Sequence, residues 1–250
     1  MKIKMNMNMN IKRHLMDEVY DRIKEKIINL ELKPGSRLLL RQMADQLGVS
    51  QTPIREALSK LSKDGLVDVV AGLGYYVVEL SSRDVREIYD LRKIYENYVL
   101  DFAVKNLGSD ELQTMKQKLN ECKKEFDKDK KTSQFYETDE DFHMRIIQNS
   151  DNRKLKEVYT RIYDLVTVCR HMYQRTTEAI EEHLTLIDAL TDKDLTRAKD
   201  ALNTHINNAR DGVLKGLKEM EGKTDENFKY AKEKARSLSL MGGERIGRPV

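Results

Sequence analysis

Residues 44–58 of this 250-residue chain read ADQLGVSQTPIREAL, and they predict the local structure of its first third. Gly48 is predicted to end one helix, because the residue just after a helix often adopts a positive φ that glycine tolerates most easily. Pro53 suits the first turn of the next helix, and Ser50 or Thr52 precedes it as a cap. Two short helices around a glycine turn are typical of a helix-turn-helix, whose second helix fits the major groove of DNA.

The sequence on both sides of this stretch completes a small domain. Upstream, apolar residues at three- and four-residue spacing predict an amphipathic helix over residues 16–30, and Pro34 and Gly35 follow as a turn. Downstream, β-rich runs at residues 66–70 and 75–78 flank a glycine turn and predict a hairpin. The pattern favours a winged helix, although helical hairpins beside small sheets also occur in unrelated folds.

Composition and charge narrow the possible classes of protein. Only 3 prolines and 12 glycines interrupt the chain, and its 2 cysteines are too few for a disulfide framework or a four-thiolate zinc site. No apolar run reaches the roughly 18 residues of a membrane helix, and the start lacks a secretory signal. The whole net charge of +3 lies in residues 1–80, where nucleic acid would most simply bind. We therefore expect a cytoplasmic, mainly α-helical protein with no membrane partner.

These N-terminal residues resemble the GntR family of bacterial transcription regulators. The resemblance rests on LELKPGSRL at residues 30–38, on the stretch at 44–58, and on DGLV at 64–67. It spans roughly residues 15–79. It implies that residues 15–80 form a winged helix-turn-helix domain and that a homodimer reads a palindromic operator in double-stranded DNA.

The resemblance also implies which residues contact DNA. Arg41 and Arg55 match the arginines with which the family reads bases or phosphates, groups that a planar guanidinium can pair with bidentately. Gln51 departs from the arginine of many members, and glutamine pairs with adenine where arginine favours guanine. The full set implied at the DNA is Arg37, Arg41, Ser50, Gln51, Thr52, Arg55 and Gly72, the last at the tip of the wing.

The rest of the chain is predicted to be an all-α bundle of six or seven helices. Helical periodicity runs almost unbroken, divided by short polar or glycine-containing joints. The predicted helices are residues 83–106, 109–130, 132–149, 152–174, 176–191 and 194–219. Such a bundle, over residues 83–222, can enclose a cavity. Residues 1–14 and 223–250 are expected to be extensions, and no function is assigned to them.

Four residues of this bundle have the chemistry of a metal site. Asp139 and His143 are four apart and share one face of a predicted helix, while His183 and His205 lie on the last two helices. Three neutral imidazoles and one carboxylate suit zinc, nickel or manganese and leave coordination positions open. Spacing alone also allows ordinary surface or core histidines, since the chain has 5 of them.

The same segments resemble the FCD effector domain of the FadR-type branch of the GntR family. The resemblance rests on DEDFH at residues 139–143, SDN at 150–152, EH at 182–183 and HI at 205–206. It implies that the aspartate and three histidines ligate a divalent cation, zinc before nickel or manganese. It also implies a small organic acid as effector, and it places Arg92 in the effector pocket. Weaker candidates for that pocket are Arg145, Arg161, Asn203 and Asn207.

Together these features predict a DNA-binding regulator, more often a repressor, whose operator affinity a small carboxylate controls through a metal-containing pocket. In one alternative the metal is structural or is itself the signal. A metal-dependent hydrolase is a third interpretation, but the sequence has neither an HExxH motif nor a nucleophile elbow. Glu182, next to His183, is expected to face away from the ion. An enzyme is therefore not expected.

Overall fold

The structure of the chain is a computed structural model. It describes residues 2–129, 133–172 and 176–220. By compactness the chain divides after Leu80, and residues 81–218 form a second unit. The extension expected over residues 223–250 lies outside the described ranges.

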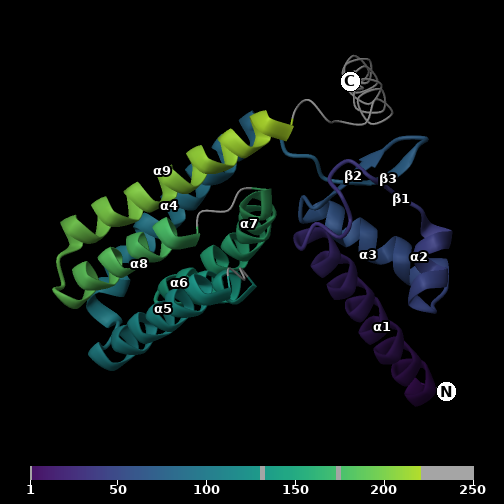
Figure 1. Cartoon of the computed structure of the whole chain (residues 1–250). Helices are drawn as coiled ribbons and strands as arrows, with labels where there is room; N and C mark the ends of the chain where they lie inside the picture. The colour runs from purple at the N-terminus through teal and green to yellow at the C-terminus, as the bar shows by residue number, and fades with distance from the viewer. Residues whose placement is uncertain (1, 130–132, 173–175, 221–250) are drawn as a thin grey trace, which may run out of the picture. The chain divides into compact units, whose positions relative to one another are not determined.

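The first unit is a winged helix (Figure 1). Its elements are α1 (Lys2–Ile28), β1 (Arg37–Leu38), α2 (Leu40–Leu47), α3 (Gln51–Lys63), β2 (Val67–Val70) and β3 (Gly74–Val77). The antiparallel sheet has the order β1-β3-β2, and α1 packs against α3 with Val19, Ile23 and Ile27 buried. These three residues lie on the apolar face that the sequence predicts for the first helix.

Two glycines form the turns that the motif requires. Gly48 ends α2 with φ of 68°, and its N–H donates to the carbonyl of Ala44. Gly72, between β2 and β3, has φ of 74°, and both glycines are exposed. A side chain at either position would be strained, because L-residues rarely adopt this region.

Two features of this unit differ from the sequence prediction. α1 begins at Lys2 instead of near Met16, so the N-terminal extension expected over residues 1–14 is helical from Lys2 onward. The strand β1 was not predicted, since two residues are too short for a pattern. It forms because Arg37 and Leu38 pair with Tyr76 and Tyr75.

The second unit is a helical bundle, which confirms the mainly α fold class. Within the described residues it has six helices, and their ends lie within two residues of the predicted ones. They are α4 (Ser82–Asn106), α5 (Ser109–Asp129), α6 (Ser133–Gln148), α7 (Arg153–Met172), α8 (Thr176–Thr191) and α9 (Leu195–Met220). α4 packs against α6 and α7, and α5 packs against α6 and α8. A capping box formed by Ser81 and Asp84 fixes the start of α4.

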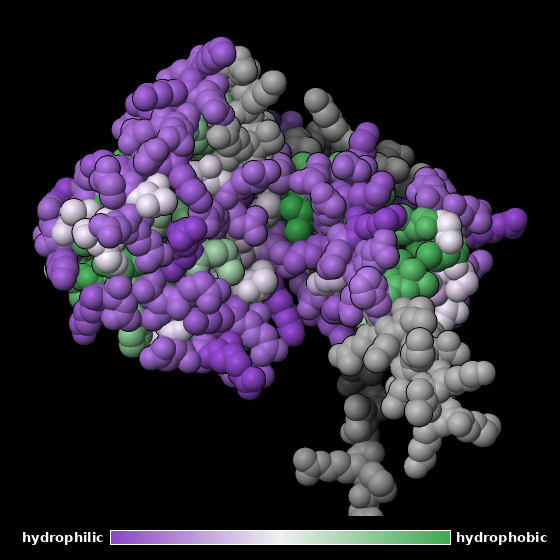
Figure 2. Space-filling view, turned by 90° about the horizontal axis from the view of Figure 1, so that it is seen from below, coloured by the Kyte–Doolittle hydropathy of each residue, from purple (hydrophilic) through white to green (hydrophobic). Residues whose placement is uncertain are grey.

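The interior of this bundle contains charged and polar side chains, as its surface does. On the face seen in Figure 2 the described surface is mostly hydrophilic, with small separate apolar patches. None of the described helices is long and apolar enough to cross a membrane. Buried charged and polar side chains seldom occur unless they are paired or functional. Those from α4, α6, α7, α8 and α9 are Arg92, Glu96, Asp139, His143, Thr167, Arg170, His183 and His205.

Candidate metal centre

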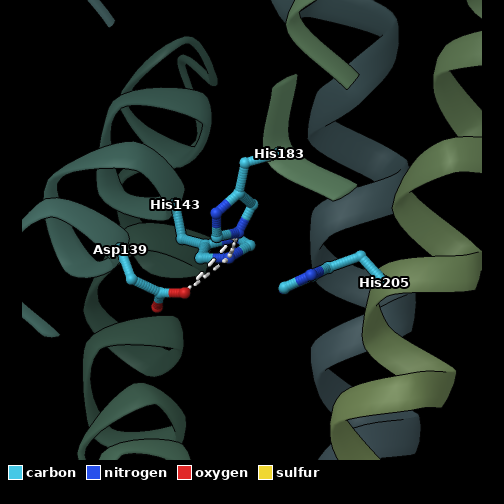
Figure 3. A group of neighbouring side chains, drawn as sticks. All are labelled: Asp139, His143, His183 and His205. Carbon is cyan, nitrogen blue, oxygen red and sulfur yellow. Dashed lines mark hydrogen bonds and ion pairs between the residues drawn. The ribbon is translucent and has the colours of Figure 1, made fainter. Parts of the chain in front are cut away.

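Three helices bring the four predicted ligands together inside the second unit. Asp139 and His143 project from α6, His183 from α8 and His205 from α9, and all four point toward a common centre (Figure 3). One potential ligand atom from each lies within 4.8 Å of those of the others, and all four side chains are buried. The pair Asp139 and His143, which one helix carries, is thus joined by His183 and His205 from two helices that come later in the sequence.

Carboxylates on the outer side of two imidazoles orient them toward this centre. Nδ1 of His143 lies 2.8 Å from Oε2 of Glu96, and Nδ1 of His205 lies 2.9 Å from Oε2 of Glu182. A carboxylate at Nδ1 holds the proton there and leaves the Nε2 lone pair free for a cation. Nδ1 of His183 has no hydrogen-bond partner within the described part of the chain.

The protonation states also suit a cation. Burial lowers the pKa of His143, and burial together with the neighbouring imidazoles lowers the pKa of His183 well below its usual value. Burial lowers the pKa of His205 to about 4, although Glu182 opposes the shift. The three imidazoles are therefore neutral near pH 7, which is the form that binds metal.

The distances fit a single ion after a small closure of the site. Nε2 of His183 lies 3.1 Å from Nε2 of His143 and 3.6 Å from Oδ1 of Asp139, and the latter two atoms are 4.0 Å apart. Ligands about 2.1 Å from one tetrahedral ion lie about 3.4 Å apart. The separations of 3.1, 3.6 and 4.0 Å lie on both sides of this value, and all four ligand atoms lie within 4.8 Å of one another. The residues present therefore fit a divalent cation with nitrogen and oxygen ligands.

Two buried arginines lie against these ligands. Nη2 of Arg92 is 2.7 Å from Nε2 of His143 and 3.4 Å from Nε2 of His205, while its Nε donates to Glu96 at 2.7 Å. Burial opposes the charge of Arg92, but Glu96 raises its pKa above the ordinary value. Arg170, from α7, forms an ion pair with Asp139. Burial, together with Arg92, lowers the pKa of Arg170 to about 10, so both guanidinium groups remain charged near pH 7.

A small cavity adjoins the ligands on the side of the arginines. Its volume is about 30 Å³, which is room for one or two water molecules. Its lining comprises Tyr89, Arg92, Phe135, Tyr136, Asp139, Arg170, Ala179, His205, Ala209 and Val213. Two arginines and two of the candidate ligands thus face one space, where a small molecule could touch a bound cation and both guanidinium groups.

The cavity corrects the list of weaker pocket candidates. Arg145 pairs with Asp141 and Glu111 near the surface, and the side chain of Asn203 accepts a hydrogen bond from Asn97. Arg161 and Asn207 do not line the cavity either. Their chemistry suits a pocket, but none of the four lines this cavity.

Sequence reasoning missed several residues of the site. Arg170 and Tyr89 line the cavity, and Glu96 and Glu182 orient the histidines. Glu96 could have been found from the sequence, because it lies four residues after Arg92 and residues at this spacing are neighbours on one face of a helix. The sequence predicts that Glu182 faces away from the ion. In the structure its Oε2 lies 2.9 Å from Nδ1 of His205.

The residues predicted to contact DNA occupy the first unit, and all seven of them are exposed. They are Arg37, Arg41, Ser50, Gln51, Thr52, Arg55 and Gly72. Ser50 holds the N-cap position of α3, as one of the two expected caps, although its side chain makes no capping hydrogen bond. Nη2 of Arg37 donates to the carbonyl of Leu73 at 2.6 Å, which fixes this arginine against the wing.

Comparison with protein families and known relatives gives a consistent result. Residues 15–77 match the gntR family of bacterial regulatory proteins, and residues 87–208 match the FCD domain. The HTH-type transcriptional regulator McbR of Escherichia coli (strain K12) is 30% identical over 172 residues, covering 65% of this chain and 76% of McbR. The HTH-type transcriptional regulator YdhC of Bacillus subtilis (strain 168) is 29% identical over 194 residues, covering 76% of this chain and 87% of YdhC.

Solved structures agree with the observed architecture. The E. coli McbR/YncC structure matches with a TM-score of 0.68 at 26% identity, over 81% of this chain and 98% of that one. The metal-free FCD domain of TM0439 matches with a TM-score of 0.51 at 26% identity, over 56% of this chain and 97% of that one. A Zn²⁺-bound form of the TM0439 domain matches at 24% identity, which supports the fold alone.

Proposed function

This chain belongs to the GntR family of bacterial regulatory proteins with an FCD domain, and from that premise we propose how the two units work together. As a member of this family it is a DNA-binding transcription regulator. In our proposal, a divalent cation held by Asp139, His143, His183 and His205 binds a small carboxylate, and the carboxylate changes the affinity of the winged helix for its operator.

The observation that carries the proposal is the set of unsatisfied donors around the cavity. Nη1 of Arg92 and both Nε and Nη2 of Arg170 are buried without a hydrogen-bond partner among the described residues. A buried donor left unpaired costs free energy, and the cost is higher for charged groups. Two guanidinium groups beside four metal-ligand candidates therefore favour an anionic ligand with oxygen acceptors, and a carboxylate meets both requirements.

Zinc is the proposed cation. Three imidazoles and one carboxylate are ligands that zinc accepts, and the TM0439 domain, which has the same fold, has been solved with Zn²⁺ bound. A bound zinc would supply a Lewis-acidic centre that attracts the carboxylate. Hydrolysis is not proposed, because the nearby carboxylates of Glu96 and Glu182 both bond to imidazole nitrogens and neither is free to act as a general base.

At the DNA, we propose that a homodimer reads a palindromic operator and acts as a repressor. The exposed Arg41 and Arg55 make no ion pair within the described part of the chain, so both are available to bases or phosphates. The relatives RspR and GlaR of E. coli are named repressors, which supports that direction of control. A palindrome requires two copies, because each half-site is read by one recognition helix.

The first test is elemental analysis of the purified protein before and after chelation, with thermal unfolding followed in both forms. We expect about one zinc per chain and a lower Tm after its removal, because a ligand that binds only the native state stabilises it. Operator affinity is then measured with zinc alone and with zinc plus a panel of small carboxylates. A response to zinc alone would make the metal the signal, and absence of any metal would overturn the metal-dependent part of the proposal.

A further inference from the structure

Arg92 is placed where it competes with a cation. Its Nη2 lies 2.7 Å from Nε2 of His143 and 3.4 Å from Nε2 of His205, and these are the two atoms that would face a metal ion. A lone pair that accepts a hydrogen bond from a guanidinium cannot donate to a metal at the same time. Binding of a cation to these histidines therefore requires the Nη2 group of Arg92 to withdraw.

The formal charges of the buried site lead to the same conclusion. Arg92 and Arg170 are balanced by Glu96 and Asp139, and these four are the buried arginine and carboxylate side chains in the described part of the chain. The carboxylate of Glu182, which is 15% exposed, adds one negative charge at the edge. A divalent cation would thus leave at least one uncompensated positive charge in a buried site, which is strongly unfavourable.

The cavity offers the position to which Arg92 can turn. Arg92 and Arg170 both line it, and Nη1 of Arg92 is buried without a hydrogen-bond partner among the described residues. Nε of Arg92 donates a hydrogen bond to Glu96. The guanidinium can therefore turn from the histidine nitrogens toward the cavity while Nε remains paired. An anion in the cavity would satisfy the free donors and also supply the missing negative charge.

We propose that Arg92 is shared between the histidine nitrogens and an anion in the cavity, so that cation and carboxylate bind as a mutually dependent pair. The inference rests on the proposed function and adds its regulation: neither ion alone fills the site well. Each ligand raises the affinity for the other by the same factor, because coupling free energies are reciprocal. We expect a factor of about ten or more, within the usual range for coupled sites.

The test measures this factor in the full-length wild-type protein. Zn²⁺ affinity is determined by titration, with free Zn²⁺ set by a chelator buffer, in the absence and presence of 50–100 mM acetate, on the order of what a weak single-carboxylate probe needs. Acetate affinity is then measured with and without saturating Zn²⁺. The expected result is about a tenfold change, equal in both directions. Zn²⁺ binding that acetate does not alter would overturn the coupling and leave the metal site in place, whereas no Zn²⁺ binding at all would overturn the proposed function as well.

A variant identifies the residue responsible. Arg92→Gln removes the competing charge, so we expect it to bind Zn²⁺ more tightly than wild type in the absence of acetate and to lose most of the effect of acetate. Arg86→Gln, on the exposed side of the same helix, is the matched control and should behave as wild type. Weaker Zn²⁺ binding by folded Arg92→Gln would show that the arginine merely supports the site. If Arg92→Gln does not fold, Arg92→Lys takes its place, because it keeps the charge but loses the forked guanidinium. An unchanged effect of acetate on Zn²⁺ affinity in Arg92→Lys would overturn the role of Arg92.

Discussion

The residues expected to read DNA and those expected to bind the cation have opposite surroundings. Arg41 and Arg55 are exposed and form no ion pair within the described part of the chain. His143 and Arg92 are completely buried, and each has hydrogen-bond contacts with more than one neighbour. Substitutions on the DNA-reading surface should therefore affect function without stability, whereas substitutions in the cluster should affect both.

One helix carries part of the buried cluster and follows the first unit in the sequence. α4 carries Arg92 and Glu96 into the cluster and begins at the capping box of Ser81, one residue after the first unit ends. A ligand can shift DNA affinity only through its different affinity for the two states of the protein. We therefore expect α4, which carries Arg92 and Glu96, to differ between those states.

The largest effect is expected at the DNA-reading surface. Arg55→Ala should lose about 1–3 kcal/mol in each half-site, and a dimer on a palindrome would lose twice that amount. The measurement is fluorescence anisotropy with an operator selected from random DNA at fixed salt. Tm and zinc content should stay unchanged, and Arg22→Ala, an exposed arginine on α1, is the control. Retained specific binding would contradict the assignment of α3 as the recognition helix.

The second prediction concerns the cluster itself. His205→Ala removes one ligand atom and should weaken zinc binding by more than the roughly 100-fold that the loss of an orienting partner can cost. The rise in Tm on adding zinc should also disappear. The exposed His14 provides the control, because His14→Ala changes the same residue type outside the cluster. Equal zinc content in both variants would show that His205 is not a ligand.

The two regions also differ in how far their sequence predicts them. Gly48 and Pro53 act on the backbone within one turn, so the helix-turn-helix could be predicted locally. Asp139 and His143 could be paired because one helix carries both. His183 and His205 were assigned through family resemblance, since spacing cannot determine which helices meet.

The remaining parts of the site depend on tertiary packing. Arg170 looked like any helix-surface arginine, and only the approach of α7 to α6 places it on Asp139. Arg92 and Glu96 form an i,i+4 pair that ordinarily lies on a surface, yet both are buried. The burial of Arg92 and Glu96 is what makes this pair part of the site. Burial depends on how the helices pack, so the sequence alone does not reveal it.

A smaller effect is expected from the residue that orients His205. Glu182→Gln replaces the charged acceptor at Nδ1 with a neutral one and should weaken zinc binding by about tenfold, the lower end of effects seen for such partners. Glu181→Gln is the matched control, because the neighbouring side chain points to the surface and pairs with Lys123. Zinc titration of the two variants checks the difference. Equal affinities would mean that the hydrogen bond to Glu182 does not tune the site.

The smallest effects come from two serines that occupy the same position at the start of a helix. Ser81 accepts a hydrogen bond from the backbone N–H of Asp84, whereas Ser50 makes no side-chain capping bond. Ser81→Ala should therefore lower the free energy of unfolding by about 1 kcal/mol and leave DNA affinity unchanged in the absence of effector. Ser50→Ala should leave stability unchanged and weaken DNA binding a few fold, about the 1 kcal/mol of one lost hydrogen bond to a phosphate. Chemical denaturation and anisotropy titrations of both variants decide, and a stability loss in Ser50→Ala would mean that its hydroxyl caps the helix after all.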